Sequence, residues 1–535
     1  MQFNQINMFK LLPQISANNS MYQTGINSLM DQTTEKPLLY QTDANQLHNF
    51  IKKLKPSDFN IQVRNIVHKM CDFLKNQCLI KLKVIRVVKG GSFGKGTALK
   101  NSSDADLVAF LDCFDNYRDQ RETRHEILEE IRQILINFGS SNTYETEDIT
   151  VPRGNPSNPP RSISFTITSK KTLEKVEFDL LPAFDAVGQF GDNAYAKLIE
   201  IGDSDGEFST CFTERQRLFV KNRPEQLKDL IRLVKYWYKM YVKPRKHDLP
   251  PGIRLPKKYA VELLTIHAWE QNGSPDKFSM AQGFRTVLEL ICRYRDLCIY
   301  WSHYYKLSNN KTLTDFVKQK LLATRPVILD PADPTGNVGE SDGWDVMVSE
   351  ASKCLQMPCV SKDQQWQVKP MTEIEITVQL MGGSLLPINA NPFTQVATIK
   401  QNIQQFWYHF SPSPQSPPVP AHQQRLMFNN TILNDSETLL EFGILDNVPI
   451  ALLVTSNDKM DIFVRNSDRH NRTYQVQPTD TVLSLKKKIE AVERNHSDQY
   501  YLVFGGKTLE DKCTLQHYNI KEHSHINMNL QLRGG

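Results

Sequence analysis

The stretch Val87–Leu111, VVKGGSFGKGTALKNSSDADLVAFL, places two aspartates one residue apart in an apolar strand, just after a run of glycines. Side chains alternate between the two faces of a strand, so Asp104 and Asp106 share one face while Ala105 and Leu107 take the other. Neighbouring carboxylates repel each other, and a shared proton or a divalent cation usually compensates them. Magnesium prefers carboxylates together with substrate phosphates. The pattern therefore predicts a cation site that also receives phosphate.

The glycines upstream fit the same interpretation. Glycine allows a tight turn and a close approach of the backbone to a phosphate, and Ser92 adds a hydroxyl. A glycine-rich loop or an Asp-x-Asp pair alone is a weak signal. Together they favour a nucleotidyltransferase of the polymerase-β type, which needs a turn that holds phosphate and a platform for two metal ions. The glycines concerned are Gly90, Gly91, Gly94 and Gly96.

A third carboxylate for this platform is expected from a neighbouring strand. The stretch KVEFDLLPAFD, residues 175–185, puts Glu177 and Asp179 on one strand face. We choose Asp179, because the Leu-Leu-Pro run after it places it near a strand end. Glu177 is the main alternative and Asp185 a lesser one.

A basic segment follows in the second half of the chain. Residues 214–258 carry fourteen Lys or Arg against four Asp or Glu. After Pro224 the pattern is that of an amphipathic helix, and four cations at helical spacing share one face. Such a face is usually only solvated, but the scarcity of acids favours triphosphates or an RNA backbone as counter-charge. The four cations are Lys228, Arg232, Lys235 and Lys239.

Composition excludes several classes of protein. The net charge of +5 is mild, and the nine scattered cysteines form no CxxC pair and have no histidine at zinc-site spacing. We interpret them as reduced thiols of a cytosolic protein. No stretch of 18 apolar residues and no secretory signal is found, so we expect no membrane partner.

The chain as a whole predicts an α+β multidomain protein. A polar leader at 1–42 is expected to be disordered, a catalytic lobe to span 43–210, and a mostly helical lobe to span 211–365. Strand patterns then dominate in two segments of similar order, 372–455 and 459–535, the first interrupted by the proline-rich insert SPSPQSPPVP. We expect each segment to have its own core and to fold apart from the lobes.

Motifs spread over roughly the first 360 residues resemble those of 2′-5′-oligoadenylate synthetases. They include SDADLVAFL, VEFDLLPAFDA, GEFSTCFTERQR, LIRLVKYWY, AQGFRTVLEL and RPVILDPADPTGN. The resemblance implies a polymerase-β-type lobe and a helical lobe that bind double-stranded RNA across a basic groove. Bound RNA would then activate synthesis of 2′-5′-linked oligoadenylates from ATP with two Mg²⁺ ions, in interferon-type antiviral innate immunity.

The last 75 residues or so resemble ubiquitin, with MDIFVRN at the start and LRGG at the end. The segment before them resembles a divergent ubiquitin-like domain. Two β-grasp domains after a synthetase unit is the arrangement of the oligoadenylate synthetase-like proteins. Two of the three positions of ubiquitin's apolar patch, Ser467, Val503 and Asn529, are polar here, so general ubiquitin receptors should bind weakly. We expect another protein partner for these domains.

The resemblance also implies roles for single residues. The catalytic and metal-binding carboxylates correspond to Asp104, Asp106 and Asp179. ATP-binding positions correspond to Ser92, Arg232, Lys235 and Tyr259. RNA-binding positions correspond to Lys75, Lys89, Lys95, Arg217 and Lys221.

Some positions depart from the family pattern. Glu225 and Gln226 stand where threonine and lysine are expected near RNA, and an acid beside phosphates weakens binding. Lys258 replaces a glutamine beside Tyr259, which affects that substrate contact. The alternative function is a catalytically silent antiviral signalling protein that binds double-stranded RNA and acts through its ubiquitin-like domains. The intact acids favour the enzyme, which we expect in the cytoplasm, with the nucleus as a second location.

Overall fold

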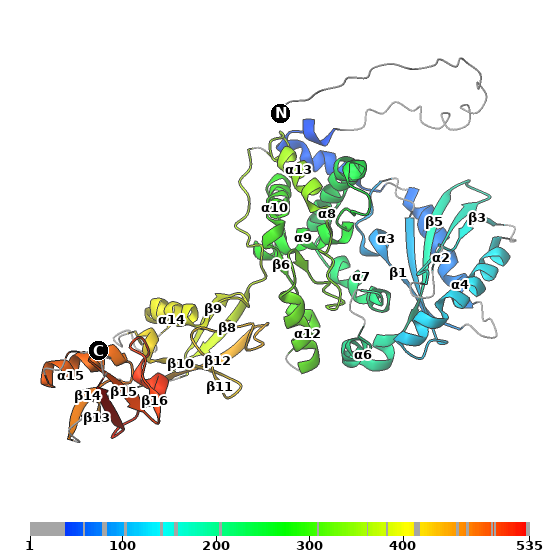
Figure 1. Ribbon diagram of the computed structural model, residues 1–535. Helices are drawn as coiled ribbons and strands as arrows, with labels where there is room; N and C mark the ends of the chain where they lie inside the picture. Colours follow the sequence, from blue (N-terminus) through cyan, green and yellow to red (C-terminus); the bar gives the residue numbers. More distant parts are fainter. Residues whose placement is uncertain are drawn as a thin grey trace, which may run out of the picture.

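The computed structural model of the protein describes residues 38–530, apart from 57–58, 77–82, 101–103, 140–142, 153, 155–158, 203–205, 308–309, 361, 381–382, 411–417, 456–458, 467–469, 494–495 and 497–498. A lobe built on a sheet, a helical lobe and two small β-rich domains follow one another through space (Figure 1). Most of the expected leader and of the proline-rich insert lies outside the described residues. No helix among the described residues is long and apolar enough to cross a bilayer.

The sheet lobe contains one five-stranded sheet in the order β1-β2-β5-β4-β3. Strands β2 and β5 run parallel, whereas every other neighbouring pair is antiparallel. Helices α2 and α4 contact this sheet, and the short helix α3 connects β1 to the loop before β2. The bounds are β1 Val84–Lys89, β2 Asp104–Leu111, β3 Tyr144–Thr150, β4 Ile163–Ser169, β5 Lys175–Phe184, α2 Phe59–Asn76, α3 Gly91–Lys95 and α4 Tyr117–Gly139.

Alternation along β2 decides which face of the sheet is available for chemistry. Ala105, Leu107 and Ala109 are at most 2% exposed and belong to the main core. Asp104 and Asp106 point to the opposite face, which turns toward the helical lobe. The sequence pattern therefore oriented β2 correctly, because burial of its apolar residues leaves only one face for the acids.

The helical lobe packs α8, α9, α10 and α13 against one another, and α7 joins it to the sheet lobe. Helix α1 also packs on this lobe, against α8 and α10. The bounds are α1 Leu47–Leu54, α5 Ala186–Phe190, α6 Ala194–Glu200, α7 Thr213–Lys221, α8 Glu225–Trp237, α9 Lys258–Gln271, α10 Met280–Cys292, α11 Ser302–Tyr305, α12 Lys311–Leu321 and α13 Trp344–Cys354, with the short strands β6 Cys298–Ile299 and β7 Val327–Ile328.

The expected boundary of the leader at residue 42 is wrong. Leu39–Gln41 form a 3-10 turn, and Leu39 is fully buried. The Tyr40 ring stacks on Tyr241 at 4.0 Å, and its hydroxyl donates to Glu350. These residues pack on the helical lobe because Leu39 is buried in the core and Tyr40 contacts Tyr241 and Glu350, which lie far away in the sequence.

Both C-terminal domains have the same sheet order, β11-β10-β12-β8-β9 in the first and β14-β13-β17-β15-β16 in the second when the latter is read in reverse. One helix, α14 or α15, follows the first hairpin in each. This is the expected β-grasp repeat. The bounds are β8 Ile374–Gln379, β9 Leu385–Ala390, α14 Val396–Phe410, β10 Gln424–Phe428, β11 Thr431–Ile432, β12 Val448–Val454, β13 Met460–Arg465, β14 Asn471–Val476, α15 Val482–Glu493, β15 Tyr500–Phe504, β16 Lys507–Thr508 and β17 His525–Leu530.

The expectation that the first ubiquitin-like domain has a core of its own is wrong. Its buried residues join the same continuous core as those of the two lobes. Tyr300, 2% exposed, donates from its hydroxyl to the carbonyl of Leu445 at 2.8 Å. The segment before β8 pairs with β6 through Cys298 N to Pro370 O and Thr372 N to Cys298 O, both 3.0 Å. The core therefore continues across the composition change near Gln364, and independent folding of this domain stays a prediction.

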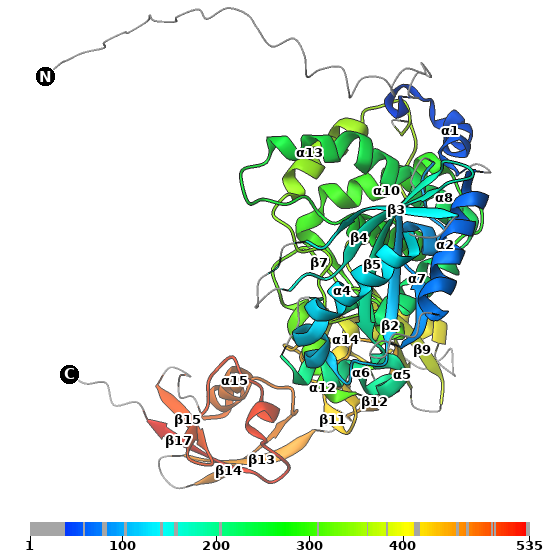
Figure 2. The ribbon, with the colours of Figure 1, turned by 90° about the vertical axis from the view of Figure 1, so that its right-hand side faces the viewer.

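The second ubiquitin-like domain does have a core of its own. The side-chain hydrogen bond that joins it to the first is donated by Arg425 Nη2 to Gln516 Oε1. Figure 2 shows this domain beside the first one and away from the two lobes. For this domain the expectation of a separate core agrees with the structure, and its separate folding stays a prediction.

Candidate active site between the two lobes

The register between β2 and β5 brings the predicted acids together. Asp106 lies opposite Asp179, and Asp104 lies opposite Glu177, in the parallel pair. All four side chains point to the same face and line one cleft. Asp179 is thus the direct neighbour of Asp106, as we expected, but the reason given was wrong. Strand β5 continues to Phe184, so Asp179 lies within the strand and not near its end.

The glycine run lies against Asp106. It forms α3, a short helix, where the sequence predicted only a turn. Gly91 has a φ of +50°, and a Cβ on this residue would lie 1.6 Å from Asp106 Oδ2. The amide of Gly90 donates to the carbonyl of Asp106 at 2.8 Å. Glycine is required at position 91 both by its backbone angle and by the carboxylate beside it.

Electrostatic repulsion within the acid cluster is visible at Asp106. Burial raises the pKa of this carboxyl, and the charges of Asp179 and Asp104 raise it further. The hydroxyl of Ser164, on β4, donates to Asp179 Oδ1 and so orients that carboxylate. The arrangement concentrates negative charge that a bound cation would stabilise.

The two alternatives for the third acid have different positions. Glu177 lines the cleft two residues before Asp179 on the same strand face. Asp185 lies elsewhere, since its carboxylate caps α5 by accepting from Gly188 N and pairs with Arg86 at 2.8 Å. The structure therefore excludes Asp185 from the cluster and leaves Glu177 as a neighbour of it.

Two cavities meet at this cluster. The larger has a volume of about 730 Å³ and is lined by the acids, Ser92, Lys235 and Tyr259. The smaller has a volume of about 320 Å³ and is lined by Thr213, Gln216 and Asp330 among others. Gly91, Lys95, Asp106 and Tyr259 line both. The arrangement offers two adjoining spaces, one on each side of Asp106.

The predicted RNA contact at Lys95 is not supported by its position. Lys95 is 8% exposed, and its ammonium pairs with Glu262 at 2.7 Å and lies 3.8 Å above the ring of Tyr259. A side chain held between these two partners does not reach an outer surface. Its burial is possible because the charge is compensated by a carboxylate and an aromatic face. Lys95 is therefore a residue of the cleft in this structure.

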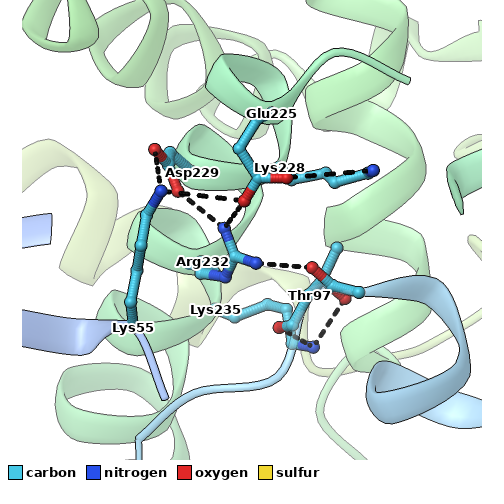
Figure 3. Close-up of polar contacts among 8 residues, drawn as sticks. Lys55, Thr97, Glu225, Lys228, Asp229, Arg232 and Lys235 are labelled. Atoms are coloured by element: carbon cyan, nitrogen blue, oxygen red, sulfur yellow. Dashed lines mark hydrogen bonds and ion pairs between the residues drawn. The ribbon is translucent and has the colours of Figure 1, made fainter. Parts of the chain in front are cut away.

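The predicted ATP contact at Arg232 also lies outside both cavities. Its guanidinium donates to Glu225 at 2.8 Å, to Asp229 at 2.6 Å and to the carbonyl of Gly96 at 2.6 Å. Figure 3 shows that it points at the loop after α3, with Lys55 on the other side of the same acids. Glu225, the residue that departs from the family pattern, thus neutralises cations at the start of α8. Arg232 holds the loop after α3 rather than lining the cleft.

Lys235 lies where the sequence placed it. Its ammonium donates to the carbonyl and the hydroxyl of Thr97, at 3.1 and 3.3 Å, and lines the larger cavity. Burial lowers the pKa of Lys235 to about 8. Lys239 and Lys258 line the same cavity. The acids of β2 and β5 therefore face Lys235, Lys239 and Lys258 across this cavity, which Lys95 and its partner Glu262 also line.

The remaining four predicted RNA contacts lie on neighbouring elements. Lys75 lies in the last turn of α2 and is exposed, Lys89 ends β1, and Lys221 ends α7 and is exposed. Arg217, on α7, packs beside Gly94 of α3. Strand β1 contacts both α2 and α7, so the elements that carry these cations are neighbours.

Sequence reasoning missed three residues of the site. Glu262 accepts from Lys95 and Thr97, Ser164 orients Asp179, and Asp330 accepts from the hydroxyl of Tyr259 at 3.0 Å. Glu262 lies in an apolar helix, and an acid there is a signal that it has a buried partner. Asp330 belongs to RPVILDPADPTGN, which was noted only as a family motif.

The donor set fits a hard divalent cation. Within the described residues, no three His, Cys, Asp or Glu side chains already converge as a complete metal cage. Asp104, Asp106 and Asp179 nevertheless supply only oxygen donors, as Mg²⁺ prefers. Burial, and after it the charges of Asp179 and Asp104, raise the pKa of Asp106, and a cation would relieve the repulsion among these carboxylates. Nucleotidyltransferases of this fold use divalent metal ions, and these residues would hold them.

Comparisons with known proteins agree with the geometry. A model described as a nucleotidyltransferase domain matches residues 48–152, and one described as 2′-5′-oligoadenylate synthetase 1, domain 2, C-terminus, matches 189–375. The ubiquitin family matches 376–457 and 462–533.

Among relatives, 2′-5′-oligoadenylate synthase-like protein 2 of Mus musculus is 34% identical over 505 residues, which cover 91% of this chain and 97% of the relative. The 2′-5′-oligoadenylate synthase 1A of Rattus norvegicus is 42% identical over 338 residues, which cover 60% of this chain and 92% of the relative. Mus musculus 2′-5′-oligoadenylate synthase 3 is 44% identical over 68% of this chain, but only 33% of that longer protein. With both lobes and both C-terminal domains matched, the chain belongs to the 2′-5′-oligoadenylate synthase family and combines a nucleotidyltransferase domain with two ubiquitin-family domains.

Proposed function

We propose that this protein synthesises 2′-5′-linked oligoadenylates from ATP when it binds double-stranded RNA, in antiviral innate immunity. Magnesium is the proposed metal, and the cytoplasm, with the nucleus as a second location, is the proposed place of action. The observation that carries the proposal is the register of Asp106 against Asp179, with Asp104 beside them, between two adjoining cavities. A polymerising enzyme needs space for a donor and for an acceptor nucleotide around one set of acids.

The proposed reaction is a nucleotidyl transfer. The 2′-hydroxyl of the acceptor attacks the α-phosphorus of the donor ATP, an O–P bond forms, and the bond to the β-phosphate breaks. Pyrophosphate leaves, and the hydroxyl proton is lost to a base for which Asp179 is our candidate. When bound, divalent cations would acidify the hydroxyl and neutralise the leaving group. Lys235 and Ser92, which both line the larger cavity, are our candidates for binding the donor phosphates.

Pyrophosphate release tests the proposal against its alternative. The full chain is incubated with ATP and Mg²⁺, with and without a long RNA duplex, and pyrophosphate is measured. We expect release that depends on the duplex. A catalytically silent sensor would bind the duplex without releasing pyrophosphate, and that result would overturn the proposal.

The lowered pKa of Lys235 predicts how ATP binding depends on pH. A triphosphate binds the charged ammonium, and above pH 8 this lysine is neutral in the free protein, because burial lowers its pKa to about 8. The KM for ATP should therefore rise between pH 7 and pH 9, approaching tenfold per pH unit above the pKa. Arginine keeps its charge throughout this range. Lys235→Arg should have a nearly flat KM, and a wild-type KM that is equally flat would contradict this role.

The cations of α7 predict electrostatic RNA binding. Arg217→Glu combined with Lys221→Glu reverses two charges on the proposed RNA side, so duplex affinity should fall at least about tenfold near 0.1 M salt. The slope of log affinity against log salt should become less steep by about 2. Fluorescence anisotropy of a labelled duplex of about 20 base pairs across salt concentrations measures both.

The exposed Lys221→Glu alone should give part of this loss without affecting packing. Lys197→Glu is the matched control, because Lys197 is an exposed lysine on α6 that pairs with Glu200. Unchanged affinity in the double variant, or an equal loss in the control, would exclude α7 as the RNA contact.

A protein partner of the ubiquitin-family domains remains part of the proposal. The outer sheet face of the first domain carries Leu453, Ile432 and Leu385, which are 45%, 53% and 55% exposed. On the second domain Asn529 occupies the corresponding outer face beside Tyr501. The first domain thus offers the more apolar surface for a partner.

A further inference from the structure

A second large cavity lies outside the site described above. It has a volume of about 720 Å³ and opens between the N-terminal part of α6, one side of α7 and the end of α11. None of the catalytic acids lines it. Its size is that of a pocket for a small organic ligand. Its lining residues are Asp192, Asn193, Tyr195, Arg215, Leu218, Phe219, Asn222, Arg223, Tyr304, Tyr305, Lys306, Asn310 and Pro331.

Three cations converge on this cavity from three parts of the chain. Lys306 pairs with Asp192 at 2.9 Å, and Arg215 lies 4.0 Å from the same carboxylate. Arg223 pairs with Glu270 at 2.6 Å and donates to the hydroxyl of Tyr304 at 3.2 Å. The side chain of Asp192 is 66% exposed, so it can turn away into solvent. Another anion could then take its place between Lys306 and Arg215.

The cavity also offers groups that recognise a heterocyclic ring. Tyr304 is 42% exposed and Leu218 is 40% exposed, so both present apolar surface to the cavity. An aromatic face binds a base by stacking. Asparagine amides carry a donor and an acceptor side by side, which match the edge of a purine. Three of them line the cavity, namely Asn193, Asn222 and Asn310. The Oδ1 of Asn310 already accepts from Leu313 N at 3.0 Å as the cap of α12, so Asn193 and Asn222 are the two that offer both groups.

We propose that this cavity binds a nucleotide, with the base against Tyr304 and the phosphates between Lys306 and Arg215. Cations, an exposed ring and amides within one cavity match the three parts of such a ligand. The proposal needs no metal ion, because side chains supply the positive charge. It is also independent of whether the chain synthesises oligoadenylates.

The position of this cavity links it to the catalytic cleft. Pro331 lines it, whereas the preceding residue Asp330 lines the smaller catalytic cavity. On α7, Arg215 faces the nucleotide cavity and donates to Tyr195, whose hydroxyl donates to the carbonyl of Ala332 at 2.6 Å. A nucleotide on Arg215 would therefore contact the wall that separates the two sites.

Photoaffinity labelling tests the proposal on the full chain. The probe is 8-azido-ATP, used without RNA and in EDTA, so that binding to metal-dependent sites is minimised. After irradiation and digestion, mass spectrometry locates the labelled residues. We expect label on the peptides that contain Leu218 or Tyr304, and we expect unlabelled ATP to suppress it.

Two variants and a control show whether the label depends on the residues of the proposed nucleotide cavity. Lys306 has a φ of +54°, which asparagine tolerates, so Lys306→Asn removes the charge without strain. It should reduce the labelling roughly five- to tenfold, as expected for one partly exposed charged contact. Tyr304→Leu removes the stacking face and should act in the same direction. Lys197→Asn, an exposed lysine of α6 outside the cavity, should change nothing.

Absence of label from these peptides would overturn the proposal, and so would label that both variants leave unchanged. Competition by tripolyphosphate and not by adenosine would also overturn it, because it would leave an anion site without recognition of a base. Strong competition by ATP, with weaker competition by tripolyphosphate and by adenosine, would support a nucleotide site.

Discussion

Asp106→Asn will abolish nucleotidyl transfer, lowering the rate at least about a thousandfold, and will leave duplex RNA binding unchanged. Asparagine keeps the shape of the side chain but cannot supply the charge that holds a divalent cation. RNA affinity should not change, because the proposed RNA contacts lie on α2, β1 and α7. The substitution also removes a charge that Asp179 and Asp104 repel, so the melting temperature should stay the same or rise. Rate, anisotropy and thermal melting are measured on the same preparation.

Glu177→Gln is the matched control for this result. Glu177 lines the same cleft and lies two residues before Asp179, opposite Asp104. Its loss should reduce the rate far less than the loss of Asp106 or Asp179. If Asp106→Asn kept more than a few per cent of the activity, or if Glu177→Gln were as damaging as Asp179→Asn, the assignment of the three acids would be wrong.

Removing both ubiquitin-family domains will destabilise the catalytic unit. A chain that ends after Val368 loses the partners of Tyr300 and of strand β6, and it exposes part of a shared core. Each large apolar side chain that returns to water costs about 1.5–3 kcal/mol, so a loss of several kcal/mol is expected. The first thermal transition should fall by at least about 5 °C. Differential scanning calorimetry, with synthesis measured in parallel, records the effect.

The control is a chain that ends after Thr455. It keeps the first ubiquitin-family domain and removes only the second, which has a core of its own. Its first transition should stay within about 2 °C of that of the full chain. Tyr300→Phe should cost about 1 kcal/mol by removing the hydrogen bond to Leu445. A chain ending after Val368 that melts and works like the full protein would show that the first domain is not part of the catalytic unit.

The local parts of this structure could be predicted because they depend on short-range patterns. Alternation along residues 104–111 oriented β2 and its two acids, since the apolar residues can be buried on one face only. The choice of Asp179 needed the strand register, which spacing alone left open between Asp179 and Glu177. The two β-grasp sheets could likewise be predicted from short stretches that resemble ubiquitin.

The errors arose where distant residues compensate a charge or cover an apolar surface. Lys95 is buried because Glu262, 167 positions later, pairs with it. Tyr40 is held by Glu350, 310 positions away. Neither partner has a local signal that points to the other, so the family resemblance assigned Lys95 to the RNA surface, and composition assigned Tyr40 to a disordered leader. The docking of the first ubiquitin-family domain was missed for the same reason. Nothing in the sequence around Tyr300 indicates that its hydroxyl donates to Leu445, 145 positions later.

The linkage of the product tests the central claim most directly. The full chain is incubated with ATP, Mg²⁺ and an RNA duplex, and the oligoadenylates are treated with a nuclease that cleaves only 3′-5′ bonds. We predict products that form only with the duplex and resist this nuclease, while Asp106→Asn forms none. Absence of oligomers from the wild-type chain with RNA, or oligomers that the nuclease degrades fully, would contradict the assignment of this site to 2′-5′-oligoadenylate synthesis.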